Sequence, residues 1–413
     1  MPGFRFLHAA DLHLDSPLVG LAQKSAEQAR IVADASRNAF EAMVDLAIAE
    51  RCAFVVIAGD LFDGQWRDWR TGLFFAGRMR RLHEAGIAVF VVLGNHDAEN
   101  LFTRRLELSP NVRLFSARRP ETVDLPEIGA AIHGMSFARR DVSENLARDY
   151  PPPLPGRYNI GLLHTALSGR EGHADYAPCT EEQLANHGYD YWALGHVHAR
   201  EVVRQDPWIV YPGNLQGRSP RETGEKGVTV VTVADGRTRL SHRPLDAVRW
   251  EVAAIDVAAA QSGEDVVALA GERLRLLCDR ADGRSLALRL SLVGTTALHH
   301  MLVAGLPEIG HEIETLAAAT SERIWIERVT LGTTPPPAAA AALDDSVAGR
   351  MERAIADLAA DPAAEARLAA LLAELKAKLP AAARPEALLS EVGAGAVERA
   401  AALATALVRG SRS

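Results

Sequence analysis

Apolar residues in the first 250 positions fall into short runs that alternate with longer helical patterns. The runs at 4–10, 54–58 and 87–93 are rich in β-branched and aromatic residues, as expected of buried strands. Helical spacing of apolar residues predicts helices at 25–51 and 71–85. Strands with crossover helices, followed by hairpin-like strands, indicate an α/β sandwich rather than a simple doubly wound sheet. The later strands are predicted at 112–115, 130–133, 158–163, 191–194, 208–211 and 228–233.

The pattern changes after residue 248. Strands at 250–257, 285–292 and 324–329 alternate with a helix at 264–278 and a helical stretch near His300, which is typical of a small α/β module. The Thr-Thr-Pro-Pro-Pro run at 333–337 is a linker by composition. We therefore predict three regions, at residues 1–248, 249–332 and 338–413.

The last region is rich in alanine and is predicted to be helical. Apolar residues recur at helical spacing from Val347 to Leu358, and Asp361 followed by Pro362 is a helix start signal. A stripe of leucines follows. Either the helices form a hairpin packed on their own protein, or they offer an apolar face to the helices of a partner.

Composition limits the class of protein. Of the 413 residues 48% are hydrophobic and 24% charged, as in ordinary globular proteins, and no apolar run reaches transmembrane length. No signal-peptide pattern opens the chain, and its three cysteines form no CxxC pair, so we expect a reducing cytoplasm and no membrane association. The net charge of −8 argues against non-specific coating of nucleic acid but allows a local basic groove.

Polar side chains follow five of the predicted strands, at the point where each strand ends. In open α/β sheets the carboxyl ends of the strands are where ligands bind, so these loops form one candidate site. Asp11 and His13, two residues apart in a segment expected to be extended, should point the same way. The other loops hold Asp60, then Asn95 with His96 and Asp97, then His164, and finally His196 with His198.

The chemistry of these residues favours two divalent metal ions. Oxygen ligands mixed with imidazoles suit Mn²⁺ or Fe²⁺, with Zn²⁺ as a further option and Mg²⁺ less suited. A shared carboxylate that bridges two ions makes a clamp that activates a hydroxide and offsets charge on a phosphorane, which favours phosphoester hydrolysis. No nucleophilic serine or cysteine motif suggests a covalent intermediate. The candidate ligands are Asp11, His13, Asp60, Asn95, His164, His196 and His198.

The motifs resemble those of the calcineurin-like metallophosphoesterase superfamily, which run D-x-H, G-D, G-N-H, H and G-H-x-H. Residues 4–245 are most similar to the SbcD and YhaO branch of bacterial DNA-repair exonucleases. The resemblance implies an α/β fold with a four-layer-type β-sandwich core, a small α/β capping domain and a helical C-terminal tail. It is carried by Phe6–His13, Ala58–Asp63, Leu93–Asp97, His173–Cys179 and Tyr211–Arg218.

The resemblance also implies roles for the residues. His96 would face the substrate, where it stabilises the phosphorane or protonates the departing oxygen, since imidazole titrates near neutral pH. Asp97 would orient that imidazole or, alternatively, cap its own loop. Asp63 would not bind a metal itself and would at most contact the metal ligands. Asp60 would bridge the two metals, with Asp11, His13 and His198 on one and Asn95, His164 and His196 on the other.

Substrate and partners are implied in the same way. The resemblance implies a Mn²⁺-dependent DNA exonuclease or endonuclease, often a homodimer, whose tail grips an SMC-like ABC ATPase of the SbcC/YhaN kind. Arg218, Arg221 and the arginine pairs at 80–81, 104–105, 118–119 and 139–140 are candidates for contacts with DNA phosphates, and Trp66 with Trp69 for stacking on a base. The alternatives for these residues are a solvated surface and loop core.

Two other functions stay open. One is a phosphodiesterase or phosphatase that acts on a small molecule or a phosphoprotein, which needs neither a DNA groove nor a partner-binding tail. The other is a scaffold that binds DNA ends or the ATPase, with hydrolysis incidental. Loss of a metal ligand would favour the scaffold, but all seven ligand positions are filled. We therefore expect the nuclease.

Overall fold

A computed structural model of the chain describes residues 3–18, 21, 26–63, 69–98, 108–168, 176–336, 347–379 and 396–410. The chain separates into two compact units, Met1–Glu251 with Gly283–Ala287, and Val252–Asp282 with Leu288–Ser413. The division predicted from the sequence at residues 249 and 338 stays a prediction. Among the described residues, no helix is long and apolar enough to cross a membrane.

The first unit contains two six-stranded sheets among its described residues. One sheet has the order β12-β11-β1-β2-β3-β4, with β1 to β4 parallel and β11 antiparallel to β1. Five of its strands lie where the sequence predicted them. The sixth, β12, was not predicted because most of its residues are polar. The strands are β1 (Phe4–Ala9), β2 (Phe54–Ala58), β3 (Ala88–Val92), β4 (Val112–Leu114), β11 (Gly227–Ala234) and β12 (Arg237–Pro244).

The second sheet has the order β5-β6-β7-β8-β10-β9. Its centre, from β6 to β10, is parallel, and antiparallel β5 and β9 form the two edges. These two edge strands are partly exposed and polar, and they too were not predicted from the sequence. The strands are β5 (Glu121–Leu125), β6 (Ala130–Gly134), β7 (Tyr158–His164), β8 (Tyr191–Gly195), β9 (Glu201–Gln205) and β10 (Trp208–Tyr211).

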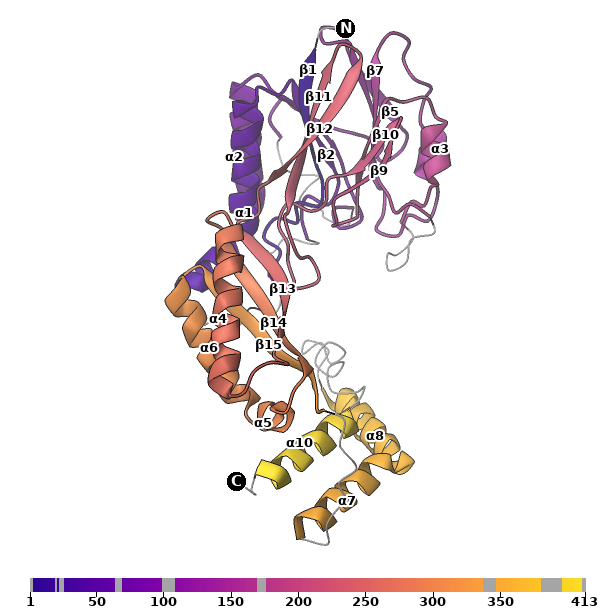
Figure 1. Cartoon of the computed structure of the whole chain (residues 1–413). Coiled ribbons are helices and arrows are strands. Elements are labelled where there is room, and N and C mark those ends of the chain that lie inside the picture. Colours follow the sequence, from indigo (N-terminus) through magenta and orange to yellow (C-terminus); the bar gives the residue numbers. More distant parts are fainter. Residues whose placement is uncertain are drawn as a thin grey trace. The chain divides into compact units, whose positions relative to one another are not determined.

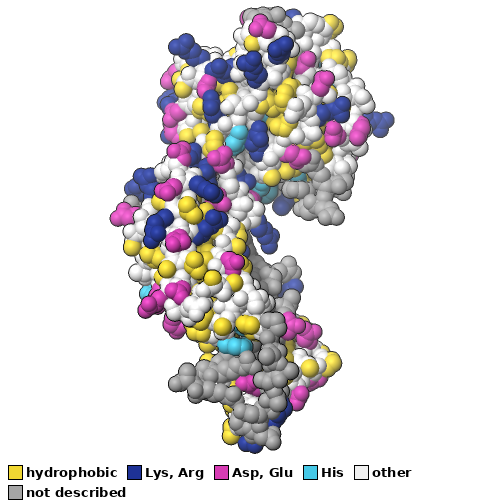
Figure 2. Space-filling model, viewed as in Figure 1, with side chains coloured by type: hydrophobic (Ala, Val, Ile, Leu, Met, Phe, Trp, Pro, Cys, Tyr) yellow, Lys and Arg dark blue, Asp and Glu magenta, His cyan; other side chains and the backbone are white. Residues whose placement is uncertain are grey.

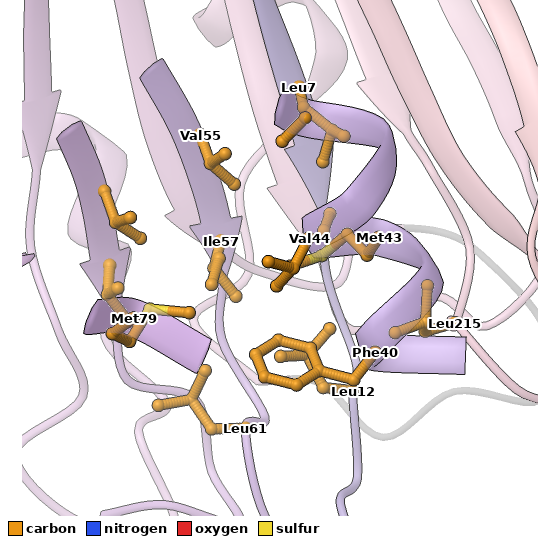
Figure 3. Packing of buried hydrophobic residues seen from close by; sticks show 14 of the residues in the cluster. Leu7, Leu12, Phe40, Met43, Val44, Val55, Ile57, Leu61, Met79 and Leu215 are labelled. Atoms are coloured by element: carbon orange, nitrogen blue, oxygen red, sulfur yellow. The ribbon is translucent and has the colours of Figure 1, made fainter. Parts of the chain in front are cut away.

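Helices cover the outer faces of both sheets, which makes the four-layer sandwich that was expected (Figure 1). On the first sheet lie α1 (Ala26–Ala49) and α2 (Trp69–Glu84), and on the second the short elements η1 (Leu146–Asp149) and α3 (Glu181–Ala185). Figure 3 shows Phe40, Met43 and Val44 of α1 packed on Val55 and Ile57 of β2. Because β1, β2 and β3 bury apolar residues on both faces, they have the unbroken hydrophobic runs seen in the sequence.

One buried polar link joins the two sheets. The His8 imidazole of β1 lies 3.0 Å from the Tyr191 hydroxyl, through Nδ1, and 3.1 Å from the Leu194 carbonyl, through Nε2. Burial lowers the pKa of His8 to about 3, so the ring is neutral. His8 is therefore structural.

The second unit combines a three-stranded sheet with helices. The sheet has the order β13-β14-β15, and α4 and α6 cover one of its faces (Figure 1). Asp361 caps α8 by accepting from the Ala363 amide, as the Asp-Pro pair predicted. The elements are β13 (Val248–Asp256), α4 (Gly263–Arg280), β14 (Ser285–Thr295), α5 (His299–Ala304), α6 (Leu306–Thr320), β15 (Ile324–Thr334), α7 (Val347–Ala360), α8 (Pro362–Lys378) and α10 (Ala396–Gly410).

Candidate metal centre

All seven predicted metal ligands meet at the carboxyl ends of β1, β2, β3, β7 and β8, and their loops have unusual backbone. Asp11, His13 and Asp60 have positive φ angles of 51°, 41° and 51°, and His196 has 99°. Left-handed backbone at residues other than glycine costs roughly 1–3 kcal/mol each and gathers at functional sites. The segment that holds Asp11 and His13 was expected to be extended, and this expectation is wrong. It follows the loop after β2, with the Asp11 amide donating to Gly59 and the His13 amide to Asp60.

Two glycines make room for the central histidine. A Cβ on Gly59 would lie 2.4 Å from His164 Nδ1, and Gly59 has a φ of +90°. A Cβ on Gly195 would lie 1.8 Å from the carbonyl oxygen of Ala58. That carbonyl accepts from His164 Nδ1 at 2.8 Å. The glycines that precede Asp60 and His196 are thus needed for close packing around one imidazole.

The tautomer of His164 follows from this contact. A carbonyl only accepts, so Nδ1 of the neutral ring donates to Ala58 and Nε2 carries a lone pair. Nε2 lies 3.0 Å from Asn95 Oδ1 and 3.6 Å from Asp60 Oδ2. Three atoms with lone pairs therefore face one another in a buried space.

A second group has the same character. His198 Nδ1 lies 2.8 Å from the carboxylate of Glu222, which leaves the lone pair of the neutral ring on Nε2. Nε2 lies 3.2 Å from His13 Nε2 and 3.7 Å from Asp11 Oδ1. His13 Nε2 is also 3.9 Å from Asp60 Oδ2, so Asp60 stands between the two groups.

These contacts fit divalent cations. Clustered lone pairs in a buried site repel one another unless a positive charge lies among them. Burial raises the pKa of Asp11 and lowers the pKa of His13 well below its ordinary value, so without a cation both charged forms are disfavoured. Ligand atoms of Asp11, His13 and His198, and likewise of Asp11, Asp60 and His164, lie within 4.8 Å of one another. The His196 ring lies beside that of His164, with centroids 5.2 Å apart.

His96 lies beside these ligands and is held by Asp63. Its Nδ1 is 3.0 Å from Asp63 Oδ1, and its backbone amide donates to Asp60 Oδ1 at 3.0 Å. The hydrogen bond to Asp63 raises the pKa of His96, and the same bond holds the pKa of Asp63 at about 2, although burial partly opposes both shifts. The contact with Asp63 thus favours the protonated form of His96 beside the predicted metal ligands.

Asp97, for which the sequence left two roles open, contacts the backbone of two loops. Its carboxylate accepts from the backbone amides of Leu61 at 3.0 Å, Phe62 at 3.1 Å and Gly94 at 3.2 Å. These contacts favour the second interpretation, a loop-capping carboxylate, and it is Asp63 that contacts the His96 ring. The cause is tertiary: the loop after β2 brings unpaired amides to Asp97 and Asp63 to His96.

We expect Asp97→Ala to destabilise the first unit. It leaves three buried amides without an acceptor, and each unsatisfied group costs about 1–3 kcal/mol, so the midpoint of thermal unfolding should fall by several degrees. Asp149→Ala, which removes an exposed carboxylate from η1, is the matched control. An unchanged midpoint in Asp97→Ala would contradict the capping role.

A cleft of about 660 Å³ opens over the ligands. Its basic lining residues are Arg140, Arg221 and Lys226, and His96 and Tyr176 also face it. On the face presented in Figure 2, Lys and Arg side chains are interspersed with Asp and Glu. The cleft thus gathers basic residues although the chain as a whole has a net charge of −8.

Only some of the residues predicted to contact the substrate line the cleft. Arg221 lines the cleft, whereas Arg218 lies 3.7 Å from both Asp63 and Glu222 and is absent from the lining. Among the arginine pairs, Arg140 reaches the cleft, while Arg81 pairs with Glu41 and Asp45 of α1. Trp69 is half exposed on α2. Trp66, the pair Arg104-Arg105 and the first three residues of the motif at 173–179 lie outside the described residues.

Glu222 was not among the residues predicted from the sequence. It contacts His198 from the segment after β10, 24 residues further along the chain. Burial acts to raise its pKa, but His198 and Arg218 outweigh burial and leave the pKa at about 2. No local motif marks Glu222, because its role depends on a contact between two separate loops.

Comparison with known proteins agrees with this geometry. Residues 4–200 match the calcineurin-like phosphoesterase family, and residues 250–334 match the middle domain of the metallophosphoesterase YhaO. The metallophosphoesterase YhaO of Bacillus subtilis is 37% identical over 294 residues, which cover 70% of this chain and 72% of that protein. The chain belongs to the YhaO family of calcineurin-like metallophosphoesterases. As a member of the YhaO family, it has a core built for phosphoester hydrolysis with divalent metals.

More distant relatives of this YhaO-family chain are archaeal. The DNA double-strand break repair protein Mre11 of Methanopyrus kandleri is 27% identical, with 51% of this chain and 48% of that protein aligned. Mre11 of Haloferax volcanii is 26% identical, with 63% and 57% aligned. The chain therefore spans about half the length of these Mre11 proteins.

Proposed function

We propose that this protein is a two-metal phosphodiesterase that cleaves DNA. The observation that carries the proposal is the convergence of lone pairs from His164, Asn95 and Asp60 in one group and from His198, His13 and Asp11 in the other. Asp60 is the proposed bridge, since one of its oxygens lies within 4 Å of both His13 and His164. The mixed ligand set, with three oxygen ligands and four imidazoles, favours Mn²⁺.

The residues of the chain then have separate tasks. When bound, two divalent ions supply a nucleophile at neutral pH and offset the charge that develops on the phosphoryl group. His96 holds a proton beside the leaving oxygen, and Asp63 fixes the direction of its ring. Arg221 binds the phosphate that neighbours the scissile one along the strand.

Two features support DNA as the substrate. The curated relatives named above as Mre11 are DNA double-strand break repair proteins. In addition, Arg140 and Arg221 line the cleft over the metal site in a chain that is acidic overall, while the buried Lys226 ammonium donates to the His198 carbonyl. A polyanion gains from such cations in proportion to the phosphates that it places against them.

The helical tail supports a protein partner. Leucines of α7, α8 and α10 are exposed, and an apolar groove of about 510 Å³ runs between these helices. Such a face suits the helices of another protein, and an SMC-like ABC ATPase is the partner that we propose on the resemblance to SbcD-type nucleases. The exposed leucines are Leu358, Leu371, Leu375, Leu403 and Leu407.

The test of the proposed function is substrate preference. End-labelled duplex and single-stranded DNA are incubated with the protein and Mn²⁺, beside the small diester bis(p-nitrophenyl) phosphate. We expect both kinds of substrate to be hydrolysed. Rapid hydrolysis of the small diester with DNA left intact would reject the nuclease and favour the small-molecule phosphodiesterase.

Arg221→Gln separates DNA from the small diester. Among the described residues, the Arg221 side chain makes no ion pair or hydrogen bond, so it is free to bind phosphate. Loss of one phosphate contact should raise the KM for DNA several-fold and reduce the salt dependence of binding by about one unit of log–log slope. Hydrolysis of bis(p-nitrophenyl) phosphate should be nearly unchanged. The control is Arg148→Gln, an exposed arginine of η1, and equal DNA affinity in both variants would contradict the contact.

A further inference from the structure

Glu222 uses both of its carboxylate oxygens. Oε1 lies 2.8 Å from His198 Nδ1. Oε2 accepts from the backbone amide of Arg218 at 2.7 Å and from Asn214 Nδ2 at 2.9 Å. The side chain is only 15% exposed, so water competes little for these bonds.

The contact with His198 selects one form of the imidazole. An ionised carboxylate can only accept, and at 2.8 Å it is much nearer to His198 Nδ1 than the Arg218 guanidinium at 3.5 Å, so Nδ1 carries a proton and donates it to Glu222. The lone pair of the neutral ring is then on Nε2. That atom faces His13 Nε2 at 3.2 Å and Asp11 Oδ1 at 3.7 Å, in the group proposed to hold one of the two metals.

We infer that Glu222 is a positioning residue that fixes the tautomer and direction of His198 for metal binding. This inference rests on the proposed two-metal function. Carboxylates that accept from a metal-ligating histidine set its ring orientation and raise its basicity, and their loss typically costs about 10–100-fold in metal affinity or activity. His164 receives the corresponding support from the Ala58 carbonyl, so each proposed metal has one histidine with a fixed tautomer.

Glu222→Gln tests this role because glutamine cannot satisfy both sides. The backbone amide of Arg218 is always a donor, so it requires an oxygen at the position of Oε2. The NH₂ group of the introduced glutamine then faces His198 Nδ1, which must accept and thereby move its own proton to Nε2. A protonated Nε2 points into the metal group and blocks one ligand position.

The experiment measures Mn²⁺ binding to the metal-free full-length chain by calorimetry, with electron paramagnetic resonance to count coupled and single ions. For Glu222→Gln we expect one of two sites to weaken by about 10–100-fold. The coupled two-ion signal should give way to a single-ion signal at Mn²⁺ levels that saturate the wild type. The control is Glu225→Gln, since Glu225 is about half exposed and lies 3.6 Å from Arg249.

The possible failures are distinguishable. Wild-type protein that binds no second Mn²⁺ would reject the proposed function itself. Two Mn²⁺ bound with equal affinity by wild type and Glu222→Gln would reject the role of Glu222 and leave the two-metal function in place. If Glu222→Gln weakens both sites together and lowers the melting temperature, Glu222 is structural support for the loop, and the inference is also rejected.

Discussion

Asp60→Asn is expected to abolish hydrolysis and to raise the stability of the metal-free protein. The Asp60 side chain is almost fully buried, and its Oδ2 faces the lone pairs of His164 and His13. Asparagine keeps an oxygen for the His96 amide and places an NH₂ donor toward these lone pairs. Removal of the carboxylate proposed to bridge the two metals should lower the rate by at least about 10³-fold, which corresponds to about 4 kcal/mol of transition-state stabilisation.

Both effects can be measured on one preparation. Mn²⁺ binding is measured by calorimetry, hydrolysis with DNA and bis(p-nitrophenyl) phosphate, and stability by thermal unfolding in a chelator. Asp149→Asn, at an exposed position, should leave all three unchanged. Asp60→Asn that still binds two Mn²⁺ with wild-type affinity would contradict the assignment of Asp60 as the bridge.

His96→Gln is expected to lower turnover without loss of metal. General acid catalysis contributes about 10²–10⁴-fold, and His96 is outside the proposed ligand set, so kcat should fall by this amount while Mn²⁺ affinity stays within a few-fold of the wild type. The loss should be large for DNA, whose leaving oxygen needs a proton. It should be much smaller for bis(p-nitrophenyl) phosphate, because p-nitrophenolate is stable without one.

The comparison between substrates makes this prediction specific. His83→Gln on the exposed side of α2 is the control, and it should behave as the wild type with both substrates. An equal loss of activity toward both substrates would contradict a proton-donor role for His96. It would indicate that the ring instead stabilises the phosphoryl group or supports the metal ligands.

The strands of the core could be predicted from the sequence because they are buried on both faces. The predicted strands 54–58 and 208–211 have the bounds of β2 and β10, and the helix predicted at 25–51 corresponds to α1. Edge strands β5, β9 and β12 were missed, since one of their faces meets water and their apolar content is low. Their pairing depends on neighbouring strands, and no local pattern encodes it.

The convergence of the ligands follows only in part from the linear pattern of the chain. Parallel strands bring their carboxyl ends to one edge of a sheet, so Asp11, Asp60 and Asn95 had to meet on the first sheet, and His164 and His196 on the second. The packing of the two sheets on each other, which no local pattern encodes, brings the two sets together. In contrast, the residues that hydrogen-bond to these side chains could be identified only from the tertiary structure. His96 pairs with Asp63 instead of Asp97, and His198 with Glu222, because a hydrogen bond between two loops depends on where their backbones lie in space.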